Sequence, residues 1–82
     1  MTRENRNRHW PHRFTCFATG RVIATEWFRA GSPDMMEEVS KRAEDWARIE
    51  GVEVDVHSGS VMPSGKVGSW DRMGLRARPV SS

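Results

Sequence analysis

The feature that most constrains the fold is the alternating run Val52-Glu53-Val54-Asp55-Val56-His57. Successive side chains of a β-strand point to opposite faces, so the three valines share one face and Glu53, Asp55 and His57 share the other. This alternation is typical of an antiparallel sheet with one covered and one solvated face. A further element must therefore pack on the valine face.

The segment before this strand predicts an amphipathic helix. Ser32 can cap a free backbone N–H, Pro33 suits the first helical position, and Asp34 complements the helix dipole. Gly51 is expected to end the helix. Apolar side chains share one arc of it, at Met35, Met36, Val39, Ala43, Trp46, Ala47 and Ile49.

Residues 13–30 are rich in aromatic, β-branched and threonine residues, which favour strands. Gly20 lies centrally, where it can supply a positive φ angle. The segment therefore predicts two antiparallel strands, near 13–19 and 22–30. Trp46 and one or both of Trp27 and Phe28 are expected to fill the core.

These elements predict an α+β fold, in which one amphipathic helix packs on one face of an antiparallel sheet of three to four strands. A chain of 82 residues is long enough for one domain. We assign residues 13–62 to a single β-β-α-β domain. Residues 1–12 are expected to form a basic N-terminal arm, because they lack periodicity and Pro11 disfavours helix at Trp10. Residues 63–82 are expected to form a C-terminal tail with room for a short extra strand.

The composition also bounds the cellular setting. Cys16 is the single cysteine, so the chain has no internal disulfide. No apolar stretch has the length of a signal peptide or a membrane span. We therefore expect a cytoplasmic protein that does not enter a membrane. An exposed strand edge would permit a homodimer as well as a monomer.

Charge is sorted along the chain although the formal net charge is only +2. Residues 1–30 hold six arginines and two glutamates, and residues 31–57 hold eight acids and three bases. Residues 58–82 hold four bases and one acid. Separated blocks of opposite sign indicate either charged partners or ends that fold over the middle.

No residue set for catalysis stands out, so we expect no enzyme activity and no cofactor. Cys16 lies in an apolar strand, where a core thiol is the expected role. His9, His12, Cys16 and His57 have ligand types that zinc accepts, but the paired cysteines of structural zinc sites are absent, so no metal site is expected. The run 59–66 resembles a phosphate-binding loop but has the wrong glycine spacing and no following helix.

Two surfaces are candidates for binding a partner. The first is basic and suits phosphate backbones or single-stranded nucleic acid, unless its residues only aid solubility. It comprises Arg3, Arg6, Arg8, Trp10 and Arg13, and Arg72, Arg76 and Arg78 could extend it.

The second candidate surface is acidic and could dock on a basic protein, although a solvated helix face is the plainer interpretation. On the helix, Glu37, Glu38 and Glu44 have basic residues four positions later, at pairing distance. The full set is Glu37, Glu38, Glu44 and Asp45 on the helix, with Glu53 and Asp55 on the open sheet face.

The order of hairpin, helix and strand resembles that of small phage-encoded anti-CRISPR proteins of the β-β-α-β type. The likeness covers Arg29-Ala30-Gly31-Ser32 at the helix start, Ala43 and Trp46 within the helix, and Gly59-Ser60 after the next strand. The resemblance implies a phage-encoded, non-enzymatic protein that binds a host protein or ribonucleoprotein complex and inhibits or modulates it. The alternative hypothesis is a small nucleic-acid-binding protein that uses the arginine-rich arm.

Overall fold

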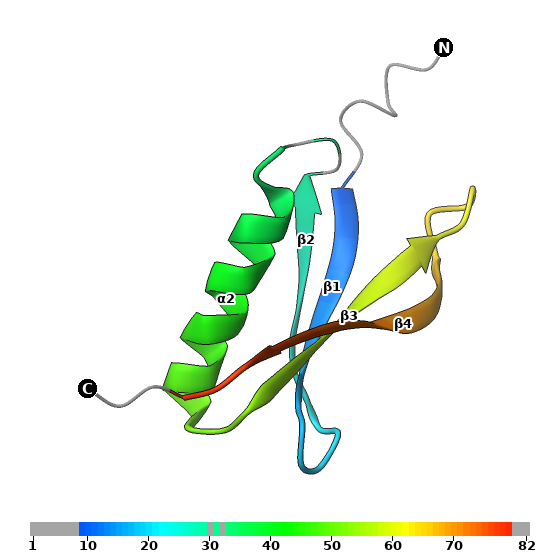
Figure 1. The fold of residues 1–82 in the computed structure, drawn as a ribbon. Coiled ribbons are helices and arrows are strands. Elements are labelled where there is room, and N and C mark those ends of the chain that lie inside the picture. Colours follow the sequence, from blue (N-terminus) through cyan, green and yellow to red (C-terminus); the bar gives the residue numbers. More distant parts are fainter. Residues whose placement is uncertain (1–8, 30, 32, 80–82) are drawn as a thin grey trace.

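The computed structural model describes residues 9–29, 31 and 33–79, and contains a four-stranded antiparallel sheet and one helix (Figure 1). The elements follow the order β1 (His9–Cys16), β2 (Val22–Arg29), α2 (Met35–Glu50), β3 (Val54–Val61) and β4 (Val67–Ala77). The strand order in the sheet is β2-β1-β3-β4. The predicted α+β fold is confirmed, with a fourth strand.

The hairpin of β1 and β2 turns at Gly20, which has a φ of 78°. The Gly20 amide donates to the Cys16 carbonyl at 2.7 Å, and the Cys16 amide donates to the Arg21 carbonyl at 2.8 Å. The first strand starts earlier than predicted, because residues 9–12 pair with β2. The assignment of residues 1–12 to an arm is therefore wrong for 9–12, and residues 1–8 lie outside the described residues.

Pro11 is compatible with β1 because of where the neighbouring ladders begin. Proline has no N–H and is normally confined to strand edges. Pro11 faces Trp27 of β2, but β3 pairs with β1 only from His12 onward. Pro11 thus lies one residue beyond the β1–β3 ladder, where Gly59 of β3 still packs against its ring, so its missing N–H interrupts none of the paired residues of that ladder.

The helix begins at Met35, later than the sequence predicts, with Asp34 at the N-cap. The Asp34 carbonyl accepts the hydrogen bond of the Glu38 amide at 2.9 Å. Pro33 lies in the preceding turn, and Ser32 lies outside the described residues. The helix ends at Gly51 as predicted, where a φ of 69° lets the amide donate back to the Ala47 carbonyl.

One hydrophobic core lies between α2 and the sheet. Phe14, Val54 and Val56 are fully buried on the sheet side, and Phe28 packs edge-to-face against Phe14. The helix contributes Val39, Ala43 and Ala47, with Trp46 partly buried beside them. Trp27 is 48% exposed, so of the two aromatic residues proposed for β2 only Phe28 enters the core.

Residues 67–77 form β4, so the extra strand allowed for in the tail is present, it is longer than expected, and the sheet extends past the domain boundary placed at 62. β4 pairs along β3 and curves strongly (Figure 1). Asp55 pairs with Arg76 and His57 pairs with Arg72, so two steps along β3 correspond to four steps along β4. The extra residues form a bulge that contains Gly74, at a φ of 79°. Bulges re-aim side chains and increase twist, so this one positions the arginines of β4.

Candidate functional site

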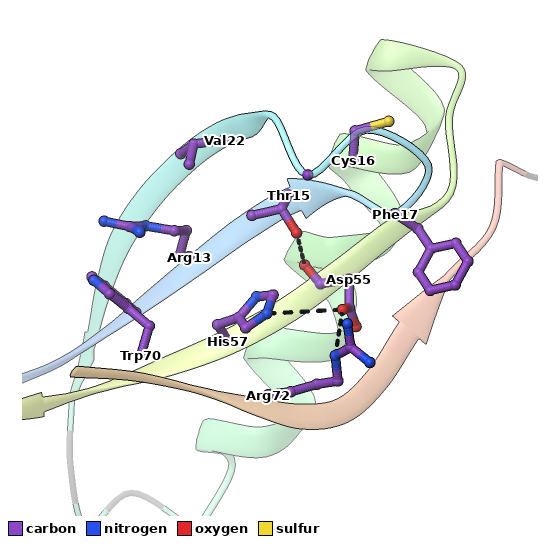
Figure 2. A pocket seen from close by; sticks show the side chains of 10 residues that line it. Arg13, Thr15, Cys16, Phe17, Val22, Asp55, His57, Trp70 and Arg72 are labelled. Atoms are coloured by element: carbon purple, nitrogen blue, oxygen red, sulfur yellow. Dashed lines mark hydrogen bonds and ion pairs between the residues drawn. The ribbon is translucent and has the colours of Figure 1, made fainter.

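The sheet face opposite α2 is open, since no described element covers it. Strand register places Arg13 of β1 beside His57 of β3, and Thr15 beside Asp55. β4 then sets Arg72 opposite His57. A hollow of about 370 Å³ forms over these strands, and Figure 2 shows side chains that line it.

Asp55 is the buried centre of the hollow, with only 4% of its side chain exposed. Arg72 Nε lies 3.1 Å from Asp55 Oδ2, and His57 Nε2 lies 3.9 Å from the same oxygen. Thr15 Oγ1 donates to the Asp55 backbone carbonyl at 3.3 Å and ties β1 to β3. The buried carboxylate is therefore neutralised by an arginine and is not available to a partner.

Two arginine–aromatic stacks lie on the open face. The Arg13 guanidinium carbon lies 4.1 Å from the centre of the Trp70 ring, and that of Arg76 lies 3.8 Å from the centre of the Phe17 ring. Figure 2 places Trp70 and Arg13 at one end of the hollow and Phe17 at the other. Each stack holds a planar cation in a fixed orientation next to exposed aromatic surface.

Two nitrogens in the hollow are buried without a hydrogen-bond partner among the described residues. They are Arg13 Nε and His57 Nδ1. A buried polar atom without a partner is costly, so each such atom in a native structure calls for an explanation, for example a bound water or ion. An oxygen-rich group would satisfy both nitrogens only if the side chains that enclose them moved.

The carboxylates predicted to form an acidic surface lie where the sequence indicated, but half of them are paired. Glu53 Oε2 lies 3.4 Å from Arg76 Nη1 and 3.9 Å from Arg78 Nε, and Asp55 pairs with Arg72. This corrects the expectation of a free acidic sheet face. The arginines of β4 cancel it.

On the helix the ion pairs differ from those predicted at four-residue spacing. Arg42 reaches across to Glu26 of β2 at 2.9 Å, and Arg48 pairs with Asp45 at 2.7 Å. No ion pair forms within the described residues at three exposed acids, Glu37, Glu38 and Glu44. These three form the unneutralised part of the acidic surface.

The residues of the predicted basic arm fall into two groups. Arg3, Arg6 and Arg8 lie outside the described residues, whereas Trp10 and Arg13 belong to β1. Arg13 faces the open hollow, and Trp10 lines a separate apolar depression near the helix start. The sequence reasoning missed the stacking partners Phe17 and Trp70, because pairing them with arginines requires the register of three strands.

The residues weighed as metal ligands or nucleophile are not gathered into one site. His9 is exposed at the start of β1, His12 is buried on the helix side, and His57 lies on the open face. Cys16 is 6% exposed, and hydrogen bonding from Thr19 lowers the pKa of its thiol. Across residues 9–79, apart from 30 and 32, no group of three or more histidine, cysteine or acidic side chains could hold a metal ion.

Nothing in the described ranges forms a helix long and apolar enough to cross a bilayer. Comparisons with protein-family models, curated proteins and solved structures found no match.

Proposed function

We propose that this protein is a non-enzymatic binding protein whose open sheet face holds a nucleic-acid strand. The observation that carries the proposal is the pair of arginine–aromatic stacks at the two ends of one hollow, Arg13 on Trp70 and Arg76 on Phe17. Nucleic-acid surfaces combine basic side chains that track phosphates with planar groups that contact bases. Both kinds of group are present on this face.

The charge balance of the open face supports a polyanionic partner. Four arginines lie on or beside it, against the two carboxylates Glu53 and Asp55. Two positive charges are thus left in excess, and three of the four arginine side chains are exposed while Arg13 is partly buried. Arginine in excess over acid favours phosphate contacts, whose contribution falls with added salt. The arginines are Arg13, Arg72, Arg76 and Arg78.

Binding is favoured over acid–base catalysis by the geometry at Asp55. A general base and the group that orients it approach within hydrogen-bond distance. His57 Nε2 is 3.9 Å from Asp55, beyond that distance, and the carboxylate is already held by Arg72. His57 is therefore better suited to contact a ligand than to form a catalytic pair.

The proposal is tested by fluorescence anisotropy with labelled oligonucleotides at low and physiological salt. We expect Arg13→Gln and Arg76→Gln each to weaken binding about tenfold, the loss of one charged contact. The matched control is Arg29→Gln, because Arg29 is an exposed arginine at the end of β2 and does not line the hollow. A variant without residues 1–8 tests the arm separately from the face. Equal affinities for Arg13→Gln, Arg76→Gln and Arg29→Gln would reject the open face as the site.

A second candidate function is inhibition or modulation of a host protein complex, as the anti-CRISPR resemblance implies. The observation that favours it is the exposed acidic set Glu37, Glu38 and Glu44, which lacks ion pairs in the described part of the chain. This surface suits a basic protein partner. We assign the chain to the cytoplasm in this proposal, where either partner class can be reached.

The two candidates are separated by affinity purification of tagged protein with and without nuclease. A protein partner retained after nuclease, and lost when Glu37, Glu38 and Glu44 are changed together to glutamine, favours the second function. A partner released by nuclease and unaffected by those changes favours nucleic-acid binding.

A further inference from the structure

We infer that the bound strand is single-stranded, with a backbone phosphate in the hollow and bases against the two stacks. This inference rests on the proposed function and names the class of nucleic acid. It starts from the polar atoms of the hollow. Arg13 Nε and His57 Nδ1 are buried without partners in the described structure, and Arg72 lies beside them. A phosphate offers oxygens that accept from the guanidinium groups of Arg13 and Arg72, which both line the hollow.

The size of the hollow fits this assignment. At about 370 Å³ it lies near the lower end of pockets that take small ligands, so it suits one nucleotide rather than a longer folded element. Its rim is open on the side away from α2, so a strand can enter and leave along the sheet surface (Figure 2). One phosphate can therefore lie in the hollow while its neighbours remain on the face.

The planar groups at the two ends require bases whose faces are free. Bases stack on aromatic rings and on guanidinium planes only when they are not already stacked within a duplex. Phe17 is 42% exposed, and Trp70 is partly exposed beside Arg13. Open four-stranded sheets that present aromatic side chains bind single-stranded RNA in this manner. The Arg13–Trp70 stack would hold the base on one side of the phosphate, and the Arg76–Phe17 stack would hold the base on the other side.

The rest of the described molecule is poorly suited to a duplex. A helix or a two-stranded ribbon normally enters the major groove. The exposed side of α2 carries Glu37, Glu38 and Glu44, which repel phosphates. The tip of the β3–β4 ribbon, residues 62–66, offers Lys66 as its one cation. A duplex would therefore gain neither stacking nor strong electrostatic contact.

The experiment compares three labelled probes of equal length by anisotropy at physiological salt: a single strand, its duplex, and an abasic strand that keeps the phosphates. We expect the single strand to bind at least tenfold tighter than either of the others, since loss of one stacked base costs roughly this factor. Phe17→Ala should weaken binding of the single strand and leave the abasic strand unchanged. The control is Met62→Ala, because Met62 is similarly exposed at the hairpin tip and away from the hollow.

The outcomes distinguish this inference from the proposed function. Duplex bound as tightly as single strand, or an abasic strand bound as tightly as the intact one, would overturn single-strand recognition and leave nucleic-acid binding in place. Equal affinities of Phe17→Ala and Met62→Ala for the single strand would overturn the stacking assignment. No binding of any probe, even at low salt, would reject both proposals.

Discussion

Gly59 lies against the ring of Trp70, and replacing it with alanine tests the packing on which the site depends. A Cβ atom at this position would lie 2.8 Å from Val67 Cγ1, 3.0 Å from Pro11 Cγ and 3.0 Å from Trp70 Cζ3. Carbon atoms in contact prefer separations of about 3.5 to 4.0 Å. The new methyl group would therefore overlap three neighbours, two of which are rigid rings.

The size of the effect follows from two opposing contributions. Overpacking a tight site costs about 1 to 3 kcal/mol. Replacing glycine also lowers the conformational entropy of the unfolded chain, which stabilises the folded state by about 0.4 to 1 kcal/mol. We expect a net loss of about 1 to 2 kcal/mol in the free energy of unfolding. For a domain of this size, that loss lowers the melting temperature by roughly 5 to 15 °C.

The matched control is Gly68→Ala, the same substitution in the neighbouring strand. Its Cβ would lie 3.3 Å from Met62 Cγ, the side chain of a flexible residue that can move aside. Thermal melts of both variants by circular dichroism measure the difference, and the displaced Trp70 should also weaken oligonucleotide binding by Gly59→Ala. Equal melting temperatures for the two variants would show that Gly59 is not enclosed as described.

Three further predictions concern buried polar groups. Arg72→Gln removes the cation 3.1 Å from the buried carboxylate of Asp55 and should cost about 1 to 3 kcal/mol, less than a fully buried pair because Arg72 is exposed. Adding Asp55→Asn should recover most of that loss in urea denaturation, whereas strictly additive losses would contradict the pairing. Burial lowers the pKa of His12, so the imidazole binds a proton more tightly in the unfolded chain than in the folded one. The free energy of unfolding should therefore fall as pH drops through and below 6.5. His12→Gln should flatten the dependence of melting temperature on pH between about 7.5 and about 5.5, and the exposed control His9→Gln should not; identical slopes for both would refute the assignment. Trp46→Phe deletes a 2.8 Å hydrogen bond from the indole nitrogen to a β2 carboxylate and should cost about 1 to 2 kcal/mol in the same denaturation assay, and a cost near zero would argue against that bond.

The sequence predicts the elements whose side chains keep one period throughout. Val54 and Val56 are buried and Asp55 lies on the other face, as strict alternation requires. Gly20 and Gly51 mark the hairpin turn and the helix end because both adopt positive φ angles there. Local patterns of this kind follow from backbone geometry alone, so they do not depend on the rest of the fold.

β4 could not be predicted with the same certainty because its bulges break the alternation. Trp70 faces the open side, while Met73 and Leu75 pack against the core, and the extra residues near Gly74 shift the register of β4 against β3.

The predicted start of the domain at residue 13 was wrong for a different reason. Pro11 lies in β1 just beyond the point where the β3 ladder starts, and that position is visible only in the paired sheet.

The same pairing explains why charge blocks in the sequence were an incomplete guide to the site. β3 brings Glu53 and Asp55 next to β4, whose Arg72 and Arg76 neutralise them, so part of the apparent acidity disappears on folding. Glu37, Glu38 and Glu44 of α2 form no ion pair in the described part of the chain and stay exposed on the helix side of the sheet. Opposite charge therefore survives as two faces of the molecule rather than as segments of the chain. A polyanion would orient such a molecule with the open face toward itself and α2 outward, where the helix carboxylates keep a second strand away.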